Sequence, residues 1–129
     1  MQSREVVPQD QAENAYWVIS ELRSGVHGEL TLFMAPGTLK LKPGFNGQII
    51  WHVFTPGWAI DAVTFPPGIS LTVDPQPDPD RQGCFSTTAA NRNTGKVNQQ
   101  FPYTITFRNK ETEKLTQAFD PVVESEALR

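Results

Sequence analysis

Metal-binding and nucleophilic side chains are scarce in this chain of 129 residues, which has two histidines and one cysteine. A catalytic zinc site usually takes three protein ligands and a structural site four, and neither a Cys-x-x-Cys nor a His-x-x-x-His spacing occurs. His27 lies in a glycine-flanked stretch that predicts an exposed turn, and His52 lies in an apolar stretch that predicts an interior or interface position. Cys84 has no second cysteine to pair with and is predicted to be a small buried apolar side chain. The sequence therefore predicts no metal site and no cofactor.

Carboxylates and hydroxyls offer two further kinds of chemistry. Asp74, Asp78 and Asp80 have oxygen ligands of the kind that Ca²⁺ takes, but the prolines between them oppose wrapping around an ion, and we expect a solvated acidic loop. The chain has no Gly-x-Ser-x-Gly motif and no glycine-rich phosphate loop, and Ser86 has no base near it in the sequence. We therefore expect a noncatalytic protein. A carboxylate pair brought together by folding is the open route to a small hydrolase.

Charge and hydropathy argue against two classes of partner. The chain has 11 basic and 14 acidic residues, a net charge of -3, and no block of like charge. Nucleic acid is not an expected partner, because binding a polyanion needs a basic patch. No stretch approaches the ~20 apolar residues that cross a bilayer, and residues 1–14 lack the apolar run of a secretion signal. We expect a cytoplasmic protein with no membrane partner.

Alternation of apolar and polar residues predicts strands along most of the chain. In the clearest example, Phe101, Tyr103, Ile105 and Phe107 occupy every second position, as in a strand with one buried face. Proline and glycine break the pattern about every 8 to 12 residues, which is typical of a β-sandwich or barrel. The sequence therefore predicts an all-β domain.

Three local patterns refine this prediction. Asn46-Gly47 tolerates positive φ and predicts a tight hairpin turn. The segment 48–54 is apolar on both faces and predicts a central strand. Leu39 and Leu41 alternate with lysines, which predicts a peripheral strand whose exposed ammonium groups discourage pairing with another chain.

Domain organisation follows from the same patterns. Residues 1–14 are polar and predict a flexible N-terminal arm, residues 15–123 a single β-domain, and residues 124–129 a frayed C-terminal tail. Residues 15–22 fit both a strand and a helical stripe that ends at Gly25. Their β-branched and aromatic cluster favours the strand, because such side chains suit a pleated surface better than a helix.

The order of two aromatic residues resembles the immunoglobulin-like superfold. Trp51 lies in a mid-chain strand and Tyr103 early in the penultimate strand, and the likeness spans about residues 15–123. The resemblance implies an antiparallel β-sandwich of about seven to nine short strands, without the inter-sheet disulfide of antibody domains because Cys84 is alone. Cupredoxins share the sandwich, but their pattern places a histidine and a methionine after the cysteine, and neither follows Cys84. The Asp-Pro pairs at 74–75 and 120–121 also resemble small uncharacterised bacterial proteins of the DP-EP family, a resemblance that implies no activity.

Two turn aromatics are the candidate contact residues. Phe45 and Trp58 lie beside proline–glycine turns, where exposed rings often contact partners or sugars. The other interpretation is that both rings cap the core. We expect a noncatalytic binding or assembly module that forms a homo-oligomer or binds a protein partner through these aromatics and an edge strand. A carbohydrate-binding or other small-ligand-binding domain that uses the same aromatics is the alternative.

Overall fold

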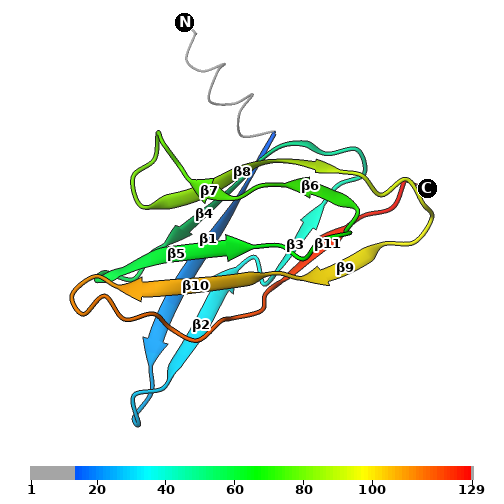
Figure 1. Cartoon of the computed structure of the whole chain (residues 1–129). Coiled ribbons are helices and arrows are strands. Elements are labelled where there is room, and N and C mark those ends of the chain that lie inside the picture. The colour runs from blue at the N-terminus through cyan, green and yellow to red at the C-terminus, as the bar shows by residue number, and fades with distance from the viewer. Residues whose placement is uncertain (1–13, 129) are drawn as a thin grey trace, which may run out of the picture.

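The computed structural model describes residues 14–128, which form strands joined by loops and turns (Figure 1). The all-β prediction is confirmed. The described residues contain eleven strands, more than expected, because β7 has two residues and Tyr103 separates β9 from β10. The strands are β1 (Ala15–Ser24), β2 (Leu30–Ala35), β3 (Thr38–Leu41), β4 (Asn46–Val53), β5 (Trp58–Thr64), β6 (Leu71–Val73), β7 (Gln76–Pro77), β8 (Cys84–Asn91), β9 (Gln99–Pro102), β10 (Thr104–Asn109) and β11 (Val122–Ser125).

The strands form three hydrogen-bonded sheets within residues 14–128, and two of these sheets are mixed. The largest has the order β2-β1-β4-β8-β6, with β7 also paired to β8. β3, β11 and β9 form the second sheet, and β10 and β5 the third. β1 is parallel to β4, and β3 is parallel to β11, so the expectation of a wholly antiparallel arrangement is wrong at these two pairs. The cause for β1 and β4 is that β2 reverses the chain and β3 belongs to another sheet, so β4 enters beside β1 in the same direction.

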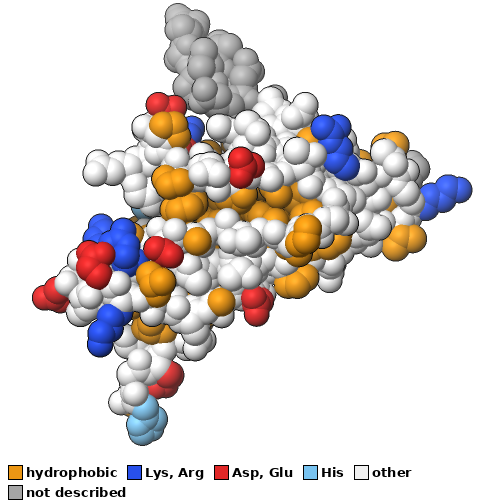
Figure 2. All heavy atoms as spheres, viewed as in Figure 1, with side chains coloured by type: hydrophobic (Ala, Val, Ile, Leu, Met, Phe, Trp, Pro, Cys, Tyr) orange, Lys and Arg blue, Asp and Glu red, His pale blue; other side chains and the backbone are white. Residues whose placement is uncertain are grey.

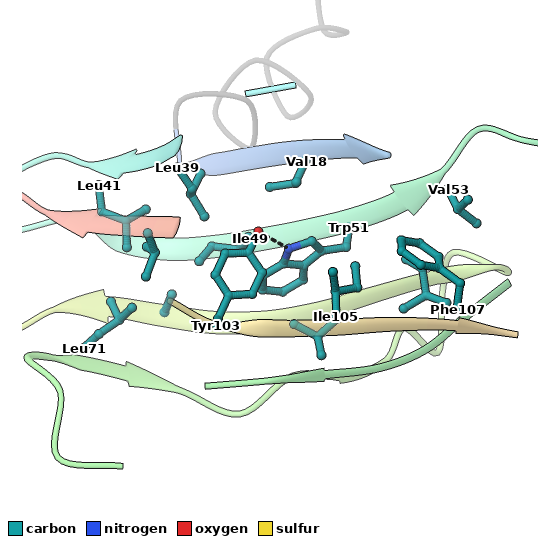
Figure 3. Close-up of a cluster of buried hydrophobic side chains, with 14 of the residues drawn as sticks. Val18, Leu39, Leu41, Ile49, Trp51, Val53, Leu71, Tyr103, Ile105 and Phe107 are labelled. Carbon is teal, nitrogen blue, oxygen red and sulfur yellow. Dashed lines mark hydrogen bonds between the residues drawn. The ribbon is translucent and has the colours of Figure 1, made fainter. Parts of the chain in front are cut away.

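The largest sheet curls around one hydrophobic core. Figure 3 shows side chains from β1, β3 and β4 on one side of this core and from β6 and β10 on the other. Trp51 and Tyr103 are both buried at its centre, and the indole Nε1–H donates a hydrogen bond to the Tyr103 hydroxyl at 3.2 Å. The ring of Phe65 stacks on Tyr103 with 4.8 Å between centroids. The two aromatics that carry the immunoglobulin-like resemblance therefore pack against each other.

Three sequence predictions of strand character are confirmed. Residues 15–22 lie in β1, where Val18, Ser20 and Leu22 are buried on one face. β4 is central, between β1 and β8. β3 is an edge strand with Leu39 and Leu41 buried and its lysine exposed.

The predicted hairpin turn at Asn46-Gly47 is wrong, because both residues lie in β4. The turn comes earlier, at Gly44, whose φ is +72°. Gly47 is needed for a different reason: a Cβ at this position would collide with the backbone oxygen of Asn14. The carbonyl of Asn14 accepts the Gln48 N–H at 2.8 Å, so the glycine permits close approach of the chain that leads into β1.

The chain ends also differ from expectation. Glu124 and Ser125 belong to β11 and are buried, and Ala127 donates its N–H to the Asn98 side-chain oxygen at 2.7 Å. Residues 124–127 are therefore packed rather than frayed, because β11 is held between β3 and β9, whereas Leu128 is exposed. The predicted arm lies outside the described residues except for Asn14.

The curled sheet does not close against β5. Figure 2 shows apolar side chains gathered in a band across the middle of the molecule, over the interval between β5 and β6. A groove of about 460 Å³ lies there, lined by Val63, Thr64, Phe65, Pro66, Pro67, Gly68, Ile69, Leu71, Val73, Asp74 and Pro75. The core residues Val63 and Leu71 therefore line a groove that is open to the surface.

Candidate functional site

Strand β2 lies at one end of the largest sheet. Its six residues, with the sequence Leu-Thr-Leu-Phe-Met-Ala, pair with β1 in one continuous register. On its other side no strand pairs with it in the part of the chain that the structure describes. The strand has no charged residue and no proline, two features that commonly protect an edge from pairing with another chain. β2 is therefore an unprotected edge.

The hairpin between β1 and β2 determines where the backbone groups of β2 point. Gly25 donates its N–H to the carbonyl oxygen of Glu29 at 2.7 Å. Opposite residues of an antiparallel pair alternate between bonded and non-bonded positions, so residues 31, 33 and 35 bond to β1. The N–H and C=O groups of Leu30, Leu32 and Met34 consequently point to the free side. This edge offers three backbone donors and three acceptors to an incoming strand.

An apolar groove of about 440 Å³ runs beside this free edge. Phe119, in the opposite wall, exchanges two backbone hydrogen bonds with Ile105, each of 3.0 Å, and its ring packs against Phe107. Both walls are therefore held in place by the sheets. The groove is lined by Leu30, Thr31, Leu32, Met34, Gly37, Phe119, Asp120 and Pro121.

The outer face of the same sheet, which points away from the core, is also rich in exposed aromatic rings. Trp17, Phe33 and Phe54 are 46%, 42% and 70% exposed. The guanidinium of Arg23 lies 3.9 Å from the ring centroid of Phe33 and 3.2 Å from a carboxylate oxygen of Glu21. Since both charged side chains are exposed, their ion pair contributes little to stability. A strand bound at the β2 edge would continue this apolar outer face.

A cysteine and a histidine lie close together on this sheet, one on β8 and the other on β4. The Cys84 Sγ lies 3.6 Å from Nδ1 of His52, across the register of these strands. Burial raises the pKa of the Cys84 thiol, and the nearby Asp78 carboxylate adds to this. A thiol with a raised pKa is a poor nucleophile. The prediction that Cys84 is buried is confirmed, and His27 is exposed as predicted.

Asp78 departs from the predicted solvated loop, whereas Asp74 and Asp80 are exposed. Its carboxylate accepts the backbone N–H groups of Asp80 and Arg81 at 2.7 and 3.0 Å and the Arg81 guanidinium at 2.9 Å. Burial raises the pKa of Asp78, but these hydrogen bonds outweigh burial and hold the pKa below its usual value. These hydrogen bonds compensate for the burial of the Asp78 carboxylate, and they also organise the turn before β8.

The structure separates the two predicted contact residues. Phe45 is 8% exposed, and its ring packs on Tyr16 with 4.8 Å between centroids. Trp58 is half-buried and packs against the core at the start of β5. The eight residues of β4 run between them, so the two rings lie at opposite ends of this strand and form no common surface. The carbohydrate alternative, which relied on both rings, gains no observation in its favour.

The sequence predicts that an edge strand makes contacts, but it does not identify residues 30–35 as that strand. The sequence signal was available in the contrast between two strands, since residues 38–42 contain two lysines and residues 30–35 contain no charge. The strand order could not be read from the sequence, and it is this order that places β2 at an edge.

Comparison with known proteins adds no family: no family model matches the chain, and no curated protein is significantly similar to it. Among residues 14–128, no three His, Cys, Asp or Glu side chains are grouped so that they could hold a metal ion. The same residues contain no helix long and apolar enough to cross a membrane.

Proposed function

We propose that this chain is a noncatalytic binding and assembly module that takes up an extended segment of another polypeptide along the free edge of β2. The observation that carries the proposal is the coincidence of an unprotected edge with an apolar groove of about 440 Å³ along its length. In this mode of recognition the main chain supplies hydrogen bonds, and pockets for alternate side chains supply specificity.

The two faces of β2 suit the two faces of an incoming strand. Side chains on one face of that strand would enter the groove beside Leu32 and Met34, and those on the other would lie next to Phe33. Both surfaces are apolar. We therefore expect an alternating segment with apolar residues on its groove side, because burying that apolar surface would drive binding.

The other edges are less suited to accept a strand. β3 has Lys40 exposed in its middle, and β5 has the exposed Asp61. β6 has only three residues, and β9 ends in a proline. Short length, charge and proline all disfavour edge pairing. Among the edge strands within residues 14–128, only β2 combines six residues with none of these features.

The immunoglobulin-like arrangement is part of the proposal at the level of fold. The buried contact between Trp51 and Tyr103 supports it. The DP-EP resemblance and the cytoplasmic location stay predictions. The single cysteine supports that location, since no disulfide is needed to hold the domain.

A labelled peptide tests the proposal directly. The probe is the β2 segment, residues 29–36, with two lysines appended for solubility and a fluorescent label, and the measurement is its anisotropy as full-length protein is added. We expect saturable binding that the Leu32→Lys variant weakens at least tenfold, because an ammonium group would enter the apolar groove.

Val97→Lys is the matched control, since Val97 is 73% exposed and does not line the groove beside β2. It should bind the peptide as the parent protein does. No saturable binding to the parent protein, or equal binding to the Leu32→Lys variant with its far-ultraviolet dichroism unchanged, would show the proposal to be wrong.

A further inference from the structure

We infer that the segment taken up at the edge is β2 of a second copy of this chain, paired antiparallel about a two-fold axis at Leu32. This inference rests on the proposed function and names its partner. A two-fold interface uses the same surface on both copies, so the strand must complement itself. β2 meets this requirement in backbone, side chains and charge.

The backbone selects one register. Leu30, Leu32 and Met34 are the residues with N–H and C=O groups on the free side. Placing Leu32 opposite the partner's Leu32 also places Leu30 opposite the partner's Met34, and Met34 opposite the partner's Leu30. All three residues then pair in both copies. A shift by two residues in either direction leaves one of the three without its counterpart.

The side chains agree with this register. On the groove side, leucine meets leucine and leucine meets methionine. On the outer side, Thr31 of one copy lies opposite the partner's Phe33, a β-branched and aromatic pair of the kind that stabilises antiparallel strands. No charged residue is brought directly opposite another, since β2 has none.

Charge on the neighbouring strand is compatible with the pairing. In the register of β1 and β2, Glu21 lies beside Phe33 and Arg23 beside Thr31. One row across the paired sheets would therefore run Glu21, Phe33, the partner's Thr31 and the partner's Arg23. The symmetric row has the same order reversed. Each row thus has an acid at one end and a base at the other, about three strand spacings apart on an exposed face, so these charges neither oppose the pairing nor add much to it.

Cysteine cross-linking tests the axis. The protein is the full chain with Cys84→Ser, so that the only thiols are those introduced. Residues in a hydrogen-bonded antiparallel pair have Cα atoms about 5.5 Å apart, within the disulfide range of about 4.4–6.8 Å. We expect Leu32→Cys to form a covalent dimer under mild oxidation, seen on a non-reducing gel.

Thr31→Cys is the matched control. Its side chain is more exposed than that of Leu32, so random collision would cross-link it more readily. In the proposed register the two Thr31 residues are offset along the strands, beyond the ~7 Å limit of a disulfide. We therefore expect little dimer. Equal or greater cross-linking of Thr31→Cys would overturn the inference.

A double variant covers the case in which Leu32→Cys does not fold. Thr31→Cys combined with Phe33→Cys places thiols on the exposed outer face, opposite each other across the axis. It should cross-link, whereas each single change should not. If neither Leu32→Cys nor the double variant dimerises, the partner is not a second copy in this register. Peptide binding at the edge would then leave the proposed function standing, and its absence would remove both.

Discussion

At the residue scale, the buried pair of Trp51 and Tyr103 joins the two sides of the core. Tyr103 is 2% exposed, and its hydroxyl accepts the indole N–H in an otherwise apolar cluster. Burial raises the pKa of Tyr103 to about 12, and the hydrogen bond from Trp51 opposes this only in part. The phenol therefore stays protonated in the folded chain well above the pH at which a free tyrosine ionises.

This pKa predicts a loss of stability at alkaline pH. The unfolded chain ionises at its ordinary value of 10.0, whereas the folded chain resists ionisation until about 12. The contribution of Tyr103 to stability is thus constant below pH 10 and declines between pH 10 and 12, by at most about 2–3 kcal/mol. Urea unfolding at a series of pH values measures this decline as a change in the free energy of unfolding.

Tyr103→Phe is the control for this prediction. The variant should lose about 1–3 kcal/mol at neutral pH, because the Trp51 N–H is left buried without an acceptor. Its stability should then fall less steeply than that of the parent above pH 10. Parallel curves for the two proteins would show that Tyr103 is not the titrating group.

At the scale of elements, the strands of this chain differ in how their edges are protected. β3 carries an exposed lysine, β6 is short, and β5 and β10 pair through a bulge between Thr106 and Phe107. β2 has none of these features. It is also flanked by a groove whose far wall, at Phe119, is fixed by backbone bonds. This difference makes β2 the strand best suited to pair with another chain.

Amide hydrogen exchange tests the orientation of β2. In dilute protein the N–H groups of Leu30, Leu32 and Met34 should exchange at least tenfold faster than those of Thr31 and Phe33, because only the latter bond to β1. Resonance-resolved exchange gives each rate. Equal protection of all the N–H groups of β2 from exchange, or faster exchange at Thr31 and Phe33, would contradict the orientation in which Leu30, Leu32 and Met34 face the free edge.

The strands could be predicted from the sequence because their signal is local. Alternation within 101–107, and lysines beside Leu39 and Leu41, report directly on which face is buried. The parallel pairing of β1 with β4 could not be predicted, since it depends on where β3 goes. The turn predicted at Gly47 is wrong for a related reason. A glycine is needed at this position because the backbone of Asn14, far away in the sequence, comes too close for a Cβ.

The contact site was harder to predict than the strands. Phe45 is predicted as a contact because it is aromatic and next to a turn, but its ring packs against Tyr16 in the core. Burial is a property of the whole arrangement, so a single aromatic cannot report it. The edge at β2 likewise exists only through the order of the sheet.

At the scale of the whole molecule, a mixed sheet curls around the core and ends at β2 without closing. Pairing of two such edges would join the largest sheets of two copies into one, with Leu32 and Met34 of each copy on the groove side and Phe33 beside the partner's Thr31 on the outer face. The shared strand is short, and interfaces that bury much less than about 800 Å² per partner are usually weak or transient. We therefore expect association that depends on concentration.

Solution mass as a function of concentration, measured by sedimentation equilibrium, tests this central claim most directly. The parent chain and Val97→Lys should pass from one chain to two as concentration rises, and Leu32→Lys should remain a single chain throughout. A parent protein that stays monomeric at millimolar concentration, or a Leu32→Lys variant that dimerises like the parent, would contradict assembly through β2.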